Sequence, residues 1–195
     1  LVGRPNVGKS TLFNALLGRR KALVLDFEGV TRDRRMETAK VEALNDRRVK
    51  ICDTGGWMPE LWRKNRDDRE MLQNIEGQIL KALEESAAIV VVMDIREGVT
   101  ALDLDIIKFI RKIGVPFVIA ANKSDQPNQT YELADFYQLG ADDVIPVSAE
   151  HKMGLVDFWE RIEKFLPEDP GPASDDDTLI KVCIVGRQKK KKSSL

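Results

Sequence analysis

The sequence is short of cysteine and histidine, and it contains no long apolar run. Its two cysteines, Cys52 and Cys183, lie in apolar, strand-like runs and resemble small buried hydrophobic residues, so we expect a reducing, cytoplasmic setting. The longest apolar runs fall far short of a membrane span and no signal peptide is visible, so we predict no membrane partner. We interpret the single histidine, His151, as an exposed surface residue rather than a catalytic one.

An excess of charge of one sign is also absent. The 31 lysines and arginines nearly cancel the 32 aspartates and glutamates, which leaves a net charge of −1. The composition therefore gives no general signal for nucleic-acid binding, and we predict no DNA partner. With 195 residues, 43% of them hydrophobic, the chain is long enough for one good core.

Residues 3–10 (GRPNVGKS) fit the pattern G-x-x-x-x-G-K-[ST], a loop whose backbone N–H groups cradle phosphates. Gly3 and Gly8 allow the backbone to approach the phosphates closely. Lys9 is expected to reach the β- and γ-phosphates, and the Ser10 hydroxyl is expected to ligate Mg²⁺. The following helix adds a favourable dipole for anions. The predicted phosphate-binding residues are Asn6, Val7, Gly8, Lys9, Ser10 and Thr11.

A second segment, residues 53–56 (DTGG), follows the short apolar run 49–52. An aspartate at the carboxyl end of a strand, followed by glycines, is where a P-loop protein holds its Mg²⁺, so Asp53 is a predicted metal ligand. Gly56 is included among the catalytic candidates. The alternative is a plain strand-to-turn boundary, which we would prefer if this segment stood alone.

A third segment, residues 122–125 (NKSD), fits N-K-x-D, which reads the guanine base in P-loop GTPases. Asp125 can accept hydrogen bonds from guanine N1–H and the N2 amino group, whereas adenine would leave this carboxylate unpaired. Asn122 is expected to support the loop and the purine edge, and the Lys123 stem to lie over the ring face. The sequence therefore predicts a guanine-nucleotide switch that binds GTP and GDP.

Residues Ser148, Ala149 and Glu150 follow another apolar run, 144–147, and fit the fifth nucleotide loop, whose backbone would touch guanine O6. The pattern S-A-x is common in proteins. It has weight here only beside the other motifs.

Strands and helices are predicted to alternate along the chain. Residues 88–93 and 115–121 are apolar runs typical of buried strands, whereas apolar residues recur at helical spacing in 102–113 and 155–166. This alternation predicts an α/β fold, the P-loop NTPase three-layer sandwich, with a mostly parallel sheet and helices on both faces.

Three regions are predicted from the change of composition. Residues 1–166 form a GTP-binding domain, residues 167–178 an acidic, proline-rich linker, and residues 179–195 the first strand and degenerate P-loop of a truncated second domain. In that second copy Lys191 stands where Gly8 stands in the first, so we expect no nucleotide there. Its four lysines are interpreted as a solvated tail, with a phosphate- or RNA-contacting tail as the alternative.

The first strand of the first copy is short in this sequence, because only Leu1 and Val2 precede the phosphate loop. The simplest explanation is that preceding residues were removed or not recorded. The alternative is that residues 179–185 fill the vacant place in the sheet, from the same chain or from a neighbouring molecule.

Taken together, the motifs resemble one family. The intact GRPNVGKSTLFNAL, residues 29–34 (GVTRDR), the DTGG and NKSD segments, the acidic linker and the second I-V-G-R are similar to the Der (EngA) family. These bacterial tandem GTPases assist assembly of the large ribosomal subunit. Family members also carry a full second GTPase domain and a KH-like domain, so a ribosomal subunit or rRNA partner is implied for the full-length family. Phe27-Glu28 depart from the proline usual before Gly29, and 58–71 is a long charge-rich stretch.

The resemblance implies further roles near the phosphates. Thr31 would close over Mg²⁺ and the γ-phosphate while GTP is bound. Trp57 stands near the position where Ras-like enzymes place a glutamine, and an indole has no acceptor with which to activate water. Relatives with an apolar residue there use K⁺ beside the phosphates, which implies Asn6 as a K⁺ ligand. The alternative is that Asn6 only hydrogen-bonds within its loop.

The favoured function is a slow, K⁺-stimulated GTPase that acts in ribosome biogenesis, with Asn6, Lys9, Thr31 and Gly56 as catalytic candidates. Two alternatives remain open. One is a guanine-nucleotide binding module with negligible hydrolysis, and the other is a related GTPase of RNA or tRNA modification.

Overall fold

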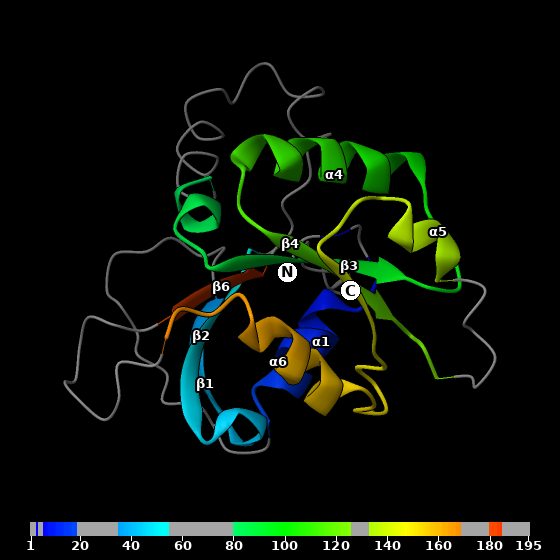
Figure 1. Cartoon of the computed structure of the whole chain (residues 1–195). Coiled ribbons are helices and arrows are strands. Elements are labelled where there is room, and N and C mark those ends of the chain that lie inside the picture. Colours follow the sequence, from blue (N-terminus) through cyan, green and yellow to red (C-terminus); the bar gives the residue numbers. More distant parts are fainter. Residues whose placement is uncertain are drawn as a thin grey trace, which may run out of the picture.

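The computed structural model describes residues 3, 6–18, 35–54, 80–125, 133–168 and 180–184. They form a six-stranded sheet in the order β1-β2-β6-β3-β4-β5 (Figure 1). Only the β1–β2 pair is antiparallel among the described strands, and the others are parallel. The strands are β1 (Arg35–Val41), β2 (Arg47–Asp53), β3 (Ala88–Asp94), β4 (Phe117–Asn122), β5 (Asp143–Pro146) and β6 (Ile180–Ile184). The helices are α1 (Lys9–Leu16), the 3₁₀ turn η1 (Glu42–Leu44), α4 (Ala101–Ile113), α5 (Ala134–Tyr137) and α6 (Leu155–Glu163).

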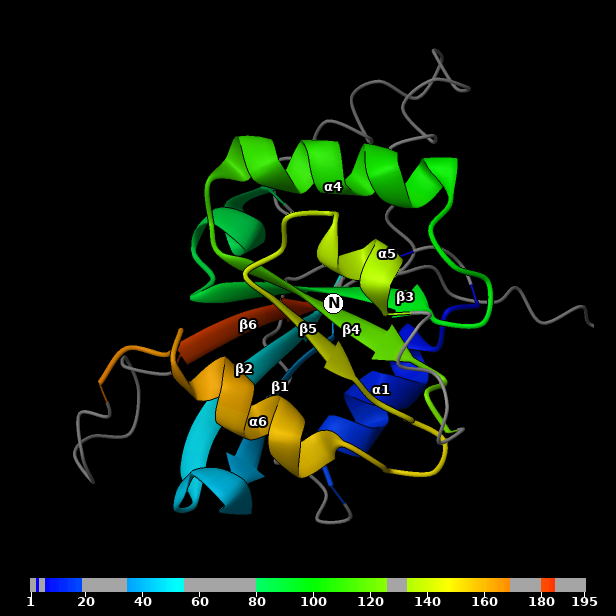
Figure 2. The same ribbon diagram turned by 45° about the vertical axis from the view of Figure 1, so that its right-hand side comes forward.

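Helices cover both faces of this sheet. Two views place α1 and α6 on one face and α4 and α5 on the other (Figures 1 and 2). Every residue of β3 and β4 is buried, which explains their continuous apolar sequence. Alternate side chains of β3 enter different cores: Val90 and Val92 pack with α1 and α6, whereas Ile89, Val91 and Met93 pack with α4 and α5. The predicted three-layer α/β fold is confirmed.

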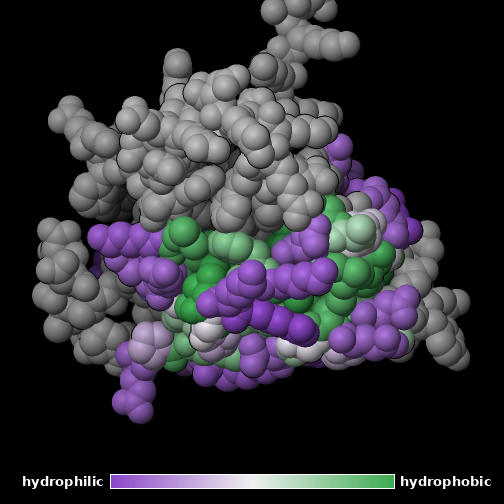
Figure 3. All heavy atoms as spheres, turned by 90° about the horizontal axis from the view of Figure 1, so that it is seen from above, coloured by the Kyte–Doolittle hydropathy of each residue, from purple (hydrophilic) through white to green (hydrophobic). Residues whose placement is uncertain are grey.

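Helix α4 follows the apolar spacing expected of it. Thr100 and Asp103 form a capping box at its start, and Gly114 ends it with a φ of 77°. Ile106, Ile107 and Ile110 are buried against the sheet. The α4 side of the molecule, seen from above, carries hydrophilic and hydrophobic groups side by side (Figure 3). In the part of the chain that the structure describes, no helix combines the length and apolarity that crossing a bilayer requires.

Strand β6 occupies the middle of the sheet, between β2 and β3. It pairs with β2 over five residues, from Val49↔Ile180 to Asp53↔Ile184, and with β3 at Ala88↔Val182 and Ile89↔Cys183. Residues 180–184 therefore lie between β2 and β3 of the same chain, as the alternative for the segment 179–185 predicted. The predicted division of the chain into a domain, a linker and a second copy, near residues 166 and 178, stays a prediction. β6 belongs to the same sheet as the strands that precede it.

The predicted burial of Cys52 and exposure of His151 can be compared with the structure, whereas the prediction for Cys183 cannot. Cys52 is buried, as expected, and the His151 side chain is 54% exposed. The Cys183 side chain lies outside what the structure describes. Residues 27–34 and 56–79, with their expected switch and charge-rich stretch, are also outside the described residues.

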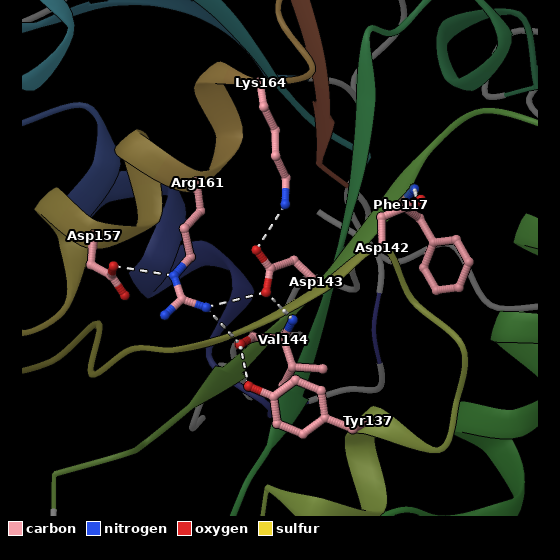
Figure 4. Close-up of polar contacts among 8 residues, drawn as sticks. All are labelled: Phe117, Tyr137, Asp142, Asp143, Val144, Asp157, Arg161 and Lys164. Carbon is pink, nitrogen blue, oxygen red and sulfur yellow. Dashed lines mark hydrogen bonds and ion pairs between the residues drawn. The ribbon is translucent and has the colours of Figure 1, made fainter.

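A cluster of charged side chains joins α6 to the start of β5 (Figure 4). Asp143 accepts hydrogen bonds from Arg161 Nη1 at 3.1 Å and from Lys164 Nζ at 3.0 Å. Arg161 Nε also donates to Asp157, at 3.1 Å. Burial by itself raises the pKa of Asp143. The hydrogen bonds from Lys164 and the Val144 N–H, together with the positive charges of Lys164 and Arg161, have a larger effect in the opposite direction. The pKa of Asp143 therefore lies below its ordinary value.

The place of β6 predicts that a proline in it destabilises the protein. Val182→Pro removes a backbone N–H from a strand with neighbours on both sides, so we expect a loss of at least about 2 kcal/mol in unfolding free energy. Urea unfolding followed by circular dichroism measures it. Ser174→Pro, in the proline-rich segment before β6, is the control. Equal stability of the two variants, or no loss when residues 174–195 are deleted, would contradict the central place of β6.

The Asp143 cluster predicts a pH-dependent contribution to stability. Because the folded pKa of Asp143 is lowered, its contribution is complete above the unfolded pKa of about 3.9 and is lost as pH falls through the folded pKa. Asp143→Asn should cost at most about 1 kcal/mol at pH 7, and the difference from wild type should be smaller at pH 3, which lies below the unfolded pKa of about 3.9. Urea unfolding at both pH values tests this. Asp157→Asn, at a 47% exposed carboxylate, should cost less, and a cost independent of pH would refute the role of the Asp143 charge.

Candidate functional site

Three of the predicted motifs, those of residues 3–10, 122–125 and 148–150, contribute to one cavity at the carboxyl ends of β3 and β4. This is where parallel α/β sheets bind ligands. Its lining comes from the loop before α1 and its first turn, from the turn after β3, and from the loops after β4 and β5. The lining residues are Gly8, Thr11, Arg96, Asn122, Lys123, Asp125, Ser148, Glu150 and His151.

The Asn122 side chain connects two of these loops. It lies at the end of β4 and is 2% exposed. Its Nδ2 donates to the Val7 carbonyl at 2.7 Å, and its Oδ1 accepts from the Ala149 N–H at 3.0 Å. One amide thereby fixes the position of the loop before α1 relative to the loop after β5.

Glycine is required at the start of α1. Gly8 has a φ of +92°, and a Cβ added there would overlap Asn122 Nδ2. Lys9 is 5% exposed, and its Nζ donates to the Gly3 carbonyl at 2.8 Å. Ser10 and Thr11 are exposed in the first turn of the helix, which contains no acidic residue. Exposed hydroxyls, a lysine and the N-terminus of a helix suit an anion.

Asp125 also lines the cavity and is partnered by Arg96. Arg96 Nη2 is 2.7 Å from both carboxylate oxygens, and His151 Nε2 is 3.7 Å from Oδ2. The hydrogen bond from Arg96 is the main cause that holds the pKa of Asp125 below its ordinary value, against burial, which raises it. The carboxylate is therefore ionised at neutral pH, in a residue that lines the cavity.

Two residues of the cavity region were not predicted from the sequence, Asp94 and Arg96. Asp94 ends β3, is 2% exposed, accepts the Arg96 N–H at 3.0 Å and pairs with Lys123 Nζ. Lys123 has a φ of 67°, and its ion pair with Asp94 holds its side chain. The signal in the sequence was a carboxylate and an arginine directly after the buried run 88–93, between two motif-bearing segments.

The remaining predicted residues fall into three groups. Ser148 is buried, Ala149 donates to Asn122, and exposed Glu150 lines the cavity. Asp53 is the buried last residue of β2, outside the cavity lining, and Asn6 is exposed with a φ of 67°. Thr31 and Gly56 lie outside the described residues. Among the described residues, no three His, Cys, Asp or Glu side chains are grouped to hold a metal ion.

Known proteins similar to this chain agree on its class. The family model for a 50S ribosome-binding GTPase matches residues 1–123. Proteins named GTPase Der are similar over the whole chain: that of Geotalea uraniireducens at 42% identity over 196 residues and that of Myxococcus xanthus at 43% over 201 residues. The chain spans only 42% of the length of each.

Two solved structures share the fold. One is the translation elongation factor SelB of Methanococcus maripaludis in complex with the GTP analogue GppNHp, with a TM-score of 0.57 and 18% identity. The other is a probable GTP-binding protein engB, with a TM-score of 0.53 and 24% identity. Both matches cover 84% of this chain, and they cover 32% and 95% of the other chains respectively.

Because Asn122 joins two loops, its loss should disturb both ends of the cavity. Asn122→Ala leaves the Val7 carbonyl and the Ala149 N–H without their partner, and we expect about 2–3 kcal/mol lower unfolding free energy. Urea unfolding gives the stability, and thermal stabilisation by added GDP gives ligand binding. Ser124→Ala, at the neighbouring half-buried position, is the control. A fully stable Asn122→Ala variant with normal GDP response would contradict the joining role.

Proposed function

The chain belongs to the 50S ribosome-binding GTPase family, and from that premise we propose that it binds GTP and GDP and hydrolyses GTP as a molecular switch. Its similarity to GTPase Der proteins over its whole length favours a role in biogenesis of the large ribosomal subunit. A ribosomal subunit or its rRNA would be the partner of the complete protein, and a bacterial cytoplasm its location.

The observation that carries the proposal is the meeting of a phosphate-type loop and an ionised carboxylate at one cavity. Gly8 and Asp125 come from distant parts of the sequence, and both line that cavity. Asn122 contacts the first loop directly through Val7. A nucleotide has an anionic end and a base with hydrogen-bond donors, so it matches both ends of the cavity.

At the phosphate end, the proposed binding residues are Asn6, Val7, Gly8, Lys9, Ser10 and Thr11. Gly8 packs so closely against Asn122 that a Cβ would overlap the amide, so only glycine suits this position of the proposed phosphate-binding loop. The hydroxyl of Ser10 and the carboxylate of Asp53, with Thr31, are hard oxygen donors of the kind that suits Mg²⁺. When bound, Mg²⁺ would neutralise charge on the β- and γ-phosphates.

At the base end, Asp125 would accept both hydrogen bonds from the Watson–Crick edge of guanine. Adenine lacks this pair of donors and would leave the carboxylate unpaired, so GTP would be preferred over ATP. Lys123, the Ser148–Glu150 loop and Asn122 would complete the base site. The Ala149 N–H is already held by Asn122 Oδ1, which fixes that loop.

Hydrolysis would not depend on a glutamine that orients water. Trp57 stands near that position in the sequence and has no acceptor for the proton of water. Lys9, Thr31 and Gly56 would stabilise and enclose the γ-phosphate, and Asn6, exposed at a φ of 67°, would hold a K⁺ ion. K⁺, when bound, would supply positive charge where an arginine finger acts in other GTPases.

A salt exchange tests this function. In single-turnover assays at equal ionic strength, we expect GTP hydrolysis to be slow in NaCl and at least about tenfold faster in KCl, because a stationary charge acts on the transition state. The measurement is the release of phosphate from prebound GTP. Asn6→Ala should lose the advantage of KCl while it retains GDP, and Asn14→Ala, exposed on the same helix-bearing segment, is the matched control.

Each outcome of the salt exchange has a clear meaning. Equal rates in both salts, or a KCl advantage that survives Asn6→Ala, would refute the K⁺ role. Tight binding of GDP with no hydrolysis in either salt would favour a guanine-nucleotide binding module over a GTPase.

A further inference from the structure

Arg96 and Asp125 form the most symmetrical ion pair in the cavity. Arg96 Nη2 is 2.7 Å from Oδ1 and 2.7 Å from Oδ2 of Asp125. A nitrogen at equal distances from both oxygens lies in the plane that bisects the carboxylate and engages both oxygens at once. Arg96 therefore engages both acceptor oxygens of Asp125, at a cavity that both residues line.

The same two oxygens of the carboxylate are the ones that guanine requires. In the proposed function, N1–H and the N2 amino group each face one oxygen of Asp125, so the base must straddle the bisecting plane. An arginine nitrogen within 2.7 Å of both oxygens and the base edge exclude each other sterically. Guanine and Arg96 are thus alternative partners of one carboxylate.

The backbone of Arg96 is held in place, whereas its side chain is exposed. Its backbone N–H donates to Asp94 Oδ1 at 3.0 Å, which holds its start at the end of β3. Its side chain is 51% exposed, whereas that of Asp125 is 20% exposed. The long, exposed side chain can therefore leave Asp125 without any movement of the sheet.

A second carboxylate is available to the displaced arginine. The pKa of Arg96 is raised, mainly by the hydrogen bond to Asp125 and its charge and further by Asp94 and Glu150, against burial. Asp94 is already paired with Lys123. Glu150 is exposed and lines the same cavity, so it is the carboxylate to which Arg96 can turn when a base takes Asp125.

We propose that Arg96 competes with the guanine base for Asp125 and so controls the rate at which the nucleotide enters its site. The inference rests on the proposed function, and it assigns to Arg96 a role in nucleotide exchange. Each binding event must first break the ion pair. Each departing base is replaced by the arginine, which keeps the carboxylate paired between nucleotides.

The size of the effect follows from the exposure of the pair. Exposed ion pairs shift an equilibrium by a factor of about five at most. Arg96→Ala should therefore bind GDP about two- to fivefold more tightly, through faster association. Loss of a positive charge would by itself slow the approach of an anionic nucleotide, so faster association cannot arise from electrostatic steering.

The experiment is stopped-flow association and dissociation of GDP with a fluorescent N-methylanthraniloyl label on its ribose. Wild type, Arg96→Ala and a control, Arg48→Ala, are compared. Arg48 is an exposed residue of β2, so its variant has the same net charge as Arg96→Ala. We expect faster association for Arg96→Ala alone, with dissociation unchanged. The ratio of its association rate to that of wild type should fall from about 0.05 M to 0.5 M salt, because salt screens the pair.

A second probe separates the two ends of the site. Inorganic pyrophosphate engages the phosphate loop and has no base, so its affinity, measured by calorimetry, should be equal in wild type and Arg96→Ala. Equal pyrophosphate binding also shows that the variant is folded.

Three results would overturn the inference. Unchanged association of Arg96→Ala would show that the arginine does not compete. Faster dissociation, or slower association, would show that Arg96 holds the base or attracts the phosphates instead. If wild type binds no labelled GDP, the proposed function fails and the inference fails with it. If wild type binds GDP and Arg96→Ala associates at the same rate, only the inference is overturned.

Discussion

The amide of Asn122 is the interaction on which the site depends. It is almost completely buried, and both of its polar atoms are used, one on the Val7 carbonyl and one on the Ala149 N–H. A buried amide with both bonds satisfied stabilises one arrangement of the loops, because any other leaves a polar group unpaired. The close fit of Gly8 against its nitrogen adds a steric condition to the electrostatic one. Asn122, at the end of β4, therefore fixes the relative positions of the loops that line the cavity.

The three layers supply the rigid support for that amide. β3 and β4 are buried along their full length, and their alternate side chains belong to different cores. A change in either core would therefore be transmitted to the strand ends, where Asp94 and Asn122 stand. Asp94 has a role parallel to that of Asn122: it holds Lys123 through its side chain and the turn after β3 through the Arg96 N–H.

What could be predicted from the sequence was local. The glycines, Lys9 and the N-K-x-D residues follow fixed spacings, and the helices and buried strands follow from periodicity and apolar runs. Arg96 escaped prediction because its partner Asp125 is close only in space, across the ends of two adjacent strands. β6 was the less favoured alternative because strand pairing between distant segments leaves no periodic trace in the sequence. Thr31 and Gly56 stay predictions, since they lie outside the described residues.

The central position of β6 also bears on how the chain reaches its fold. β2 must wait for a partner about 130 residues further along the sequence, and closing so long a loop costs entropy before any pairing compensates for it. In this arrangement β2 and β3 gain their shared neighbour only when residues 180–184 pair with both, and strand edges that wait unpaired are prone to association with other chains. The middle of the sheet would be the last part to form. The slowest step of sheet formation would then be the pairing of five residues with strands that precede them by about 90 to 130 residues.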